Sequence, residues 1–344
     1  MELLDRLCKV TAISGFENCG CDSIKNIFDE IFDETYVDSI YNVTGYIRCG
    51  KENAPLIMIE AHYDSIGLMV KSIHDGGFVS VVPIGGVDSR ILPGSQVVLH
   101  GKKDITGICG AKPPHLLSRD DMEKAVKTED ICIDTGYSKD ELLKIIEIGT
   151  PITVSPAHFD MCGDKFCGNF LDNRAGLFAV LKATKQLKSE NCLCHDICVL
   201  ASTGEETFQT GARSAARKIG PDVAIVVDVT HGITPDVSKD EAATPGKGAV
   251  ICLGPNLSRR HNNILFSALE ENNIEYQTEV EEGSTGTNAW VIQTTGCGVP
   301  CVLISVPLKY MHTPVEVVCK KDIDSVCAAI VCFIKKLCGG KENA

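Results

Sequence analysis

Hydrophobic residues recur along this chain at intervals that distinguish helices from strands. Apolar positions spaced by three and four residues predict amphipathic helices. Short continuous apolar runs predict buried strands, because a strand covered on both faces has no polar side. The predicted helices are residues 2–10, 22–32, 174–188, 211–218, 263–272 and 321–337, and the predicted strands are 56–59, 196–202, 223–229, a segment near 276 and 302–305.

The pattern changes between residues 68 and 157. This stretch is rich in Val, Ile and Gly, and short apolar runs at 78–82 and 96–100 lie between Gly-containing turns. Such spacing is typical of a small β-barrel or sandwich. We therefore expect an α/β domain, built from residues 1–67 and 158–344, with a mainly parallel central sheet flanked by helices. Residues 68–157 are expected to form an inserted β-rich barrel domain.

Composition narrows the possible partners. The 344 residues are 44% hydrophobic and 23% charged, which is enough apolar material for two ordinary globular domains. The formal net charge of −13 would repel a phosphate backbone, so no nucleic-acid partner is expected. No segment has the ~20 successive apolar residues that span a bilayer, and the first residues are acidic where a signal peptide would be basic. We expect no membrane partner and a cytoplasmic location.

The 18 cysteines do not indicate a disulfide framework, because that interpretation applies to short secreted chains. We expect reduced thiols, most of them packed as small hydrophobic side chains. Cys194 and His195 are adjacent and Asp196 follows, but Cys192 and Cys194 are separated by one residue rather than the two of a zinc ribbon, and no complete ligand set is evident. The pattern therefore predicts no metal site at this position.

Five short polar segments lie at predicted strand ends or in loops, where sites in α/β folds are built. Each is weak evidence alone, since a single His is more often structural and a Glu pair is more often a solvated face. Together they supply two imidazoles and several carboxylates, a ligand set that suits zinc, cobalt or manganese. The segments are His62-Tyr63-Asp64, Leu171-Asp172-Asn173-Arg174, Gly204-Glu205-Glu206, Asp228-Val229-Thr230 and Met311-His312-Thr313-Pro314.

These segments, in this order, resemble the glutamyl/leucyl aminopeptidase (M42) family of two-metal peptidases, which includes the tetrahedral (TET) aminopeptidases. Residues 61–70 resemble the family's His-x-Asp-x-Ile-Gly segment, and residues 312–317 resemble its last ligand loop. Residues 92–94, 112–116 and 134–136 resemble its inserted domain. The resemblance covers nearly the whole chain.

The resemblance implies a metal-dependent aminopeptidase that removes N-terminal residues from short peptides. It implies two divalent ions per subunit (Zn, Co or Mn), which would polarise the scissile carbonyl and activate a water. It also implies a homo-oligomer, often a dodecamer, in which the inserted domain is the oligomerisation domain. The implied metal ligands are His62, Asp172 and Asp228 for one ion and Asp172, Glu206 and His312 for the other, with Asp172 bridging.

The resemblance also assigns the residues around the ligands. Glu205 would be the general base, and Asp64 would orient His62. The chain departs from the family pattern at Gly204, which stands where Gln is common, and at Asn288, which replaces an acid in a Gly-Thr-Asp-Ala segment. We expect Thr287 and Asn288 to contact substrate. The preferred N-terminal residue is not predicted.

Three other functions remain open at this point. The same ligand set would serve a two-metal amidase or deacylase acting on N-acylated amino acids, since activated water does not choose its leaving group. A noncatalytic peptide-binding protein on the same fold would not require the Glu205 carboxylate. Some family members carry a cellulase label, but a His-rich metal set has no evident use in glycoside hydrolysis.

Overall fold

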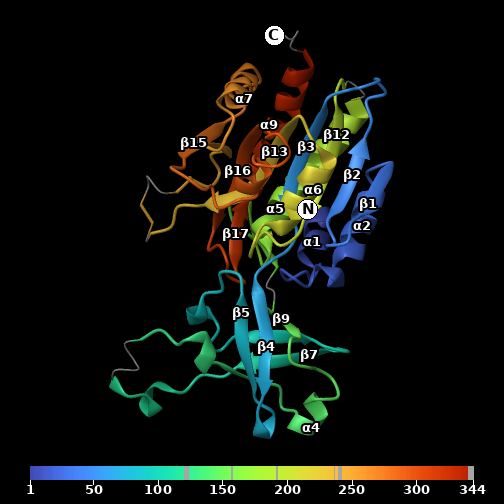
Figure 1. The fold of residues 1–344 in the computed structure, drawn as a ribbon. Coiled ribbons are helices and arrows are strands. Elements are labelled where there is room, and N and C mark those ends of the chain that lie inside the picture. Colours follow the sequence, from blue (N-terminus) through green and yellow to red (C-terminus); the bar gives the residue numbers. More distant parts are fainter. Residues whose placement is uncertain (120–123, 156–157, 191–192, 236, 239–241, 340–344) are drawn as a thin grey trace.

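The computed structural model describes residues 1–119, 124–155, 158–190, 193–235, 237–238 and 242–339. The chain forms a large α/β domain and a smaller barrel that extends from one end of it (Figure 1). The carboxyl-terminal helix ends at the opposite extremity of the α/β domain (Figure 1). Within the described residues, no helix has the length and apolar character needed to cross a membrane.

Within the described residues, the α/β domain is organised around an 11-stranded sheet. Its four middle strands, in the order β12-β3-β13-β16, run parallel, and the flanking pairs β1–β2 and β11–β17 are antiparallel. The bounds are β1 Glu34–Val37, β2 Val43–Ile47, β3 Leu56–His62, β10 Phe159–Met161, β11 Lys165–Gly168, β12 Asp196–Ser202, β13 Val223–His231, β14 Ala249–Leu253, β15 Tyr276–Val280, β16 Cys301–Lys309 and β17 Glu316–Cys319.

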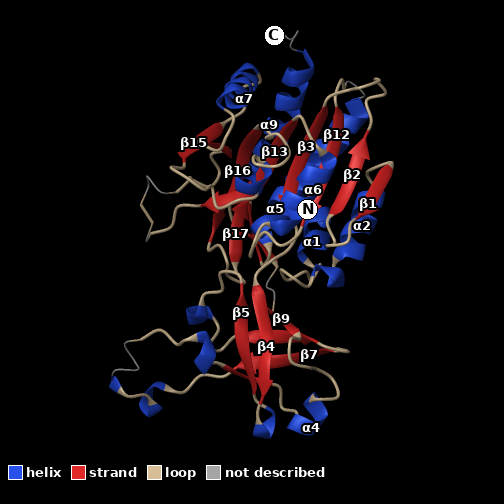
Figure 2. Ribbon diagram, viewed as in Figure 1, coloured by secondary structure: helices blue, strands red, loops and turns tan. Residues whose placement is uncertain are grey.

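Helices cover both faces of the middle strands (Figure 2). On β3, Ile57 and Ile59 pack into the large core with α5 and α9, whereas Met58 packs into a smaller core with α6 and α8. Successive strand residues point to opposite faces, so burial on both faces explains the continuous apolar runs. The helices are α1 Glu2–Cys8, α2 Cys21–Asp29, α5 Leu171–Glu190, α6 Thr210–Ile219, α7 Arg259–Glu271, α8 Ala289–Ile292 and α9 Lys320–Gly339.

The smaller domain is a closed barrel in the order β4-β5-β8-β7-β6-β9. On β7, buried Ile105 and Cys109 alternate with exposed residues, the period-2 pattern of a half-buried strand. The barrel has its own apolar core, separate from those of the α/β domain. Its elements are β4 Gly67–Ile73, β5 Val79–Ile84, β6 Gln96–His100, β7 Asp104–Cys109, β8 Cys132–Asp134 and β9 Pro151–Val154, with the short helix α4 Lys139–Leu142.

The predicted fold class, a mainly parallel sheet with an inserted barrel, is confirmed. Barrel strands lie between Gly67 and Val154, and the predicted end of the insert, residue 157, is outside the described residues. The predicted helix at 263–272 begins earlier, at Arg259, because the Ser258 side chain caps it by accepting a hydrogen bond from the backbone of His261.

Candidate metal centre

Three neighbouring parallel strands bring most of the predicted site together. His62 is the last residue of β3, the Glu205-Glu206 pair follows the end of β12, and Asp228 lies in the second half of β13. Because β12, β3 and β13 are adjacent and parallel, their carboxyl ends meet at one edge of the sheet. The apolar runs that precede these residues are buried in the sheet. Each polar side chain therefore lies at or near the point where its strand leaves the core.

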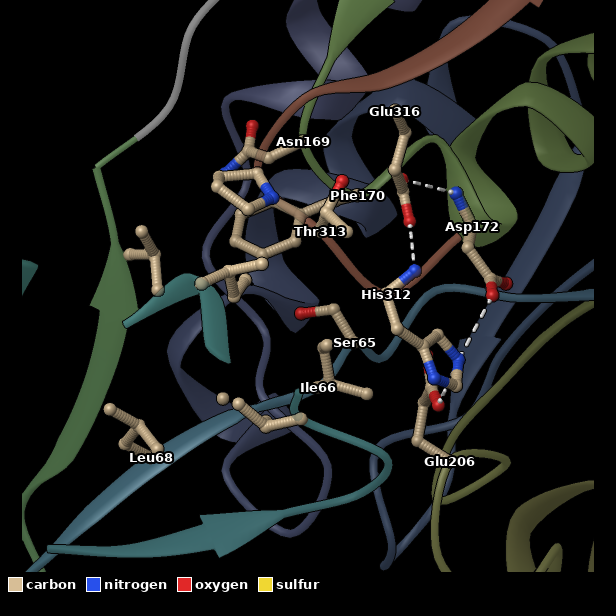
Figure 3. A pocket seen from close by; sticks show the side chains of 15 residues that line it. Ser65, Ile66, Leu68, Asn169, Phe170, Asp172, Glu206, His312, Thr313 and Glu316 are labelled. Atoms are coloured by element: carbon tan, nitrogen blue, oxygen red, sulfur yellow. Dashed lines mark hydrogen bonds and ion pairs between the residues drawn. The ribbon is translucent and has the colours of Figure 1, made fainter. Parts of the chain in front are cut away.

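Asp172 and His312 reach the same edge from outside these strands. Asp172 lies at the start of α5, and His312 lies in the loop between β16 and β17 with a φ of 62°. This left-handed backbone is uncommon for a residue with a side chain. The loop turns the imidazole back toward Asp172 and Glu206 (Figure 3).

The predicted ligands form two clusters that share Asp172. Nε2 of His62 lies 3.2 Å from Oδ1 of Asp172 and 3.7 Å from Oδ1 of Asp228. Nε2 of His312 lies 3.3 Å from Oδ2 of Asp172 and 3.2 Å from Oε2 of Glu206. In each cluster the donor atoms all lie within 4.8 Å of one another. One Asp172 oxygen therefore faces each cluster, the arrangement required of a bridging carboxylate.

The donor set fits two divalent cations. Among the described residues, these carboxylates form ion pairs only with histidines, and no Lys or Arg neutralises them. Asp172, Asp228 and His62 are nearly inaccessible to solvent, so water cannot screen their charges. Two histidines cannot balance the charge of all the buried carboxylates, which is costly, and cations held by N and O ligands would remove that cost.

The crowding of buried charged groups shifts the pKa values of the predicted metal ligands and of Glu205. Burial, together with the charges of Asp228 and Glu206, raises the pKa of Glu205 to about 9. Burial and Asp172 raise the pKa of Glu206 to about 7. Burial opposes the charging of His312, but Asp172 and Glu206 outweigh it and raise its pKa to about 11. Without cations the centre holds protons that cations must displace, so its affinity for cations should increase with pH.

Asp64 lies behind this centre and is fully buried. Its backbone oxygen is 3.1 Å from Nδ1 of His62, and its Oδ1 is 3.6 Å from the same nitrogen. Its carboxylate also accepts hydrogen bonds from the backbone nitrogens of Glu205 (3.1 Å) and Glu206 (3.2 Å). Asp64 thus contacts an imidazole and the loop that carries both glutamates, which supports the predicted orienting role.

Glu316 is a functional residue that the sequence reasoning missed. It is 2% exposed at the start of β17, and its two oxygens accept hydrogen bonds from the backbone nitrogens of His312 (2.9 Å) and Asp172 (3.1 Å) (Figure 3). Burial, reinforced by the Asp172 charge, raises its pKa. The available signal was its position within residues 312–317, which resemble the family's last ligand loop. Glu316 fixes the backbones of two predicted ligands.

Replacing Glu316 with Gln should weaken cation binding about 10- to 100-fold, the usual effect of losing a group that orients ligands. The amide keeps one acceptor oxygen but turns an NH₂ group toward a backbone N–H that then has no partner. Titration against a competing chelator measures the change, with exposed Glu52→Gln as the control. Equal affinities in the two variants would refute this role of Glu316.

Thr287 and Asn288, predicted to contact substrate, lie in different surroundings. Thr287 lines the cavity next to the clusters. Asn288 is 1% exposed and its amide donates to Glu60 (2.7 Å) and Ser202 (3.0 Å) behind the strands, so it is not part of that lining. An acid at position 288 would place a second carboxylate against buried Glu60. The departure from the family's Asp thus has a physical reason, namely the presence of Glu60.

Comparisons with known proteins agree with this geometry. A family model described as M42 glutamyl aminopeptidase matches residues 42–328. A lysyl aminopeptidase from Pyrococcus furiosus is 31% identical over 98% of this chain and 97% of its own length.

Two solved structures resemble this chain over nearly its whole length. Aminopeptidase APDkam598 from the archaeon Desulfurococcus kamchatkensis superposes with a TM-score of 0.90 at 31% identity, covering 97% of this chain and 94% of its own. The PhTET1-12s structure, with a dodecamer in the asymmetric unit, gives a TM-score of 0.83 at 27% identity, covering 97% and 98%. The chain belongs to the M42 family of metal-dependent aminopeptidases.

Proposed function

We propose that this enzyme removes N-terminal residues from short peptides with two divalent cations, zinc, cobalt or manganese, and with Glu205 as general base. The observation that carries the proposal is the position of the Asp172 carboxylate, whose two oxygens each face one His-containing cluster. Glu205 belongs to neither cluster. Oε2 of Glu205 lies 4.0 Å from Nε2 of His62, and Oε1 accepts a hydrogen bond from Gln209 (3.0 Å). The Glu205 carboxylate is thus close to the clusters and held in place.

Bound cations would supply Lewis acidity toward the scissile carbonyl and acidify the attacking water. The chain's own residues handle the proton. Glu205 takes it from the attacking water and returns it to the leaving amine, which is the work of a general base followed by a general acid. Burial and its acidic neighbours raise the pKa of Glu205 to about 9, and positive charge beside it would lower that value toward neutral pH.

We further propose that the preferred N-terminal residue is basic. A cavity of about 610 Å³ opens beside the clusters, and Glu279 and Glu281 line it together with several of the predicted metal ligands. Among the described residues that line it there is no Lys or Arg. Glu279 accepts a hydrogen bond from Thr230, and burial raises the pKa of its carboxyl group. The positive charge of a bound substrate would stabilise the ionised carboxylate. The Pyrococcus furiosus relative is named a lysyl aminopeptidase, which agrees with a preference for Lys or Arg.

The double substitution Glu279→Gln, Glu281→Gln should lower kcat/KM for lysyl-anilide at least tenfold relative to leucyl-anilide. A hydrogen bond to a charged group contributes about 1.5–3 kcal/mol, which corresponds to a tenfold effect or more. Glu282→Gln, at the exposed neighbouring position outside the cavity lining, is the matched control. A wild-type preference for glutamyl substrates, or an unchanged lysyl-to-leucyl ratio in the double variant, would overturn this assignment.

We also propose that the barrel mediates a homo-oligomer, with a dodecamer as the expected form. Large hydrophobic side chains are exposed on this domain, among them Ile148 (72% exposed) and Ile108 (54% exposed). Such side chains support an interface where they form a contiguous patch. Light scattering coupled to size exclusion should give about twelve times the mass of one chain, as for the solved dodecameric relative. A monomeric mass would contradict the proposal.

A further inference from the structure

A second group of metal-binding side chains lies at the other end of the α/β domain. Cys194 and His195 immediately precede β12, and Cys338 lies in the last turn of α9. The seven residues of β12 separate this group from the Glu205 loop by about 23 Å at roughly 3.3 Å per residue. The group therefore shares no ligand with the acidic centre.

The fold supplies the partner that the local sequence lacked. Adjacent Cys194 and His195 did not predict a site alone, but Cys338, 144 residues beyond Cys194, packs against both. Nδ1 of His195 lies 3.1 Å from Sγ of Cys338. The sulfur and nitrogen donor atoms of the three residues all lie within 4.8 Å of one another.

These separations approach those of a tetrahedral metal site. Zinc bonds of ~2.3 Å to sulfur and ~2.0–2.1 Å to nitrogen place neighbouring donors roughly 3.5–3.8 Å apart. Small side-chain rotations therefore suffice to make the three donors converge on one ion. The backbone nitrogen of Cys194 also donates to Sγ of Cys338 (3.3 Å), a hydrogen bond that would stabilise a thiolate there.

The exposure of these three residues and their sulfur and nitrogen donor atoms favour a metal site over unreactive thiols. All three residues are partly exposed, which leaves a path for an ion from solvent. Burial, together with neighbouring Cys194, raises the pKa of Cys338 to about 11, so a bound cation would have to displace its proton. Two sulfur donors and one imidazole match the preference of zinc, whereas the carboxylate-rich centre at the other end is a harder site.

We propose that Cys194, His195 and Cys338 form a separate zinc site that fastens the end of α9 to the start of β12; among the described residues, these three supply its ligands. This site is structural, because it contains none of the residues assigned to catalysis. The alternative use of the same sulfurs is a Cys194–Cys338 disulfide, which would leave His195 without a role in the cluster.

Cadmium titration tests the proposal, because thiolate-to-cadmium charge transfer absorbs in the ultraviolet and N/O ligands give no such band. The full-length enzyme is titrated under a non-thiol reductant. Wild type and the control Cys297→Ser, an exposed cysteine elsewhere, should show a band that saturates at one sulfur-bound ion per chain. Cys338→Ser and His195→Asn should lose or strongly weaken it while aminopeptidase activity stays unchanged.

Zinc content provides the second readout. The protein purified with zinc should contain one ion fewer per chain in Cys338→Ser than in Cys297→Ser. A charge-transfer band of equal strength in Cys338→Ser and wild type would overturn the proposal. Absence of the band in reduced wild type, with the two sulfurs joined in unreduced protein, would establish the disulfide instead. The His195→Asn variant, which leaves both cysteines in place, guards against a misfolded Cys338→Ser chain.

Discussion

Glu205→Gln should lower kcat for peptide hydrolysis by about 10²- to 10⁴-fold, the usual contribution of a positioned general base. The amide cannot accept the proton of the attacking water, although it fills the same volume. Gln209 would still contact the side chain, and Asp64 would still accept the backbone hydrogen bond of residue 205. The loop that also carries Glu206 should therefore keep its conformation.

Steady-state kinetics and metal analysis on the same preparation separate catalysis from binding. We expect Glu205→Gln to hold as much metal as wild type, with KM nearly unchanged, and exposed Glu52→Gln to behave as wild type. A variant that retains more than about a tenth of wild-type kcat would remove Glu205 from the role of base. Loss of metal along with activity would make Glu205 a ligand.

Asp172→Ala should abolish activity through loss of metal at both clusters. One oxygen of Asp172 faces His62 and the other faces His312, so a single substitution removes a ligand from each cluster. Lewis-acid stabilisation contributes several kcal/mol, and each 1.36 kcal/mol is tenfold in rate, which gives a loss of about 10³-fold or more. Metal analysis after dialysis measures occupancy directly.

Asp228→Ala provides the comparison for this prediction. Among the described residues, Asp228 belongs to the His62 cluster and not to the other, so its removal should empty one cluster and leave the cluster of Glu206 and His312 occupied. Circular dichroism checks that both variants fold. If Asp172→Ala and Asp228→Ala lose the same amount of metal, Asp172 does not bridge the two clusters.

Sequence periodicity predicted the part of the fold that is determined by local burial. The middle strands β3, β12 and β13 are covered on both faces, so their apolar runs were evident, and His62, Glu205 and Asp228 lie directly after or within those runs. The pairing of Asp172 with His312 came from the family resemblance, since no local pattern connects the start of α5 with the loop between β16 and β17.

Strands that their own composition or length does not specify were missed. Strand β1 (Glu34–Val37) is half-exposed and polar, and it is a strand because it pairs with β2 rather than because of its own composition. Strand β17 is four residues long, too short for a periodicity signal, yet it positions Glu316.

Side-chain contacts between residues far apart in the sequence could not be predicted either. Asn288 donates to Glu60 across 228 positions, and His195 contacts Cys338 across 143. Contacts of this kind exist only once the chain has folded, and they are the ones that place Asn288 against Glu60 and create the cysteine–histidine cluster. Residues adjacent in the sequence gave no indication of either partner.

The most direct test of the central claim is hydrolysis of lysyl-, leucyl- and glutamyl-anilides and their N-acetylated counterparts. Chelator-stripped enzyme is assayed before and after zinc, cobalt or manganese is restored. We predict that activity is absent without metal, returns with it, is confined to free-amine substrates and is highest for the lysyl compound. Hydrolysis of the N-acetylated compounds would identify an amidase, and metal-loaded enzyme that turns over neither class would contradict the aminopeptidase mechanism.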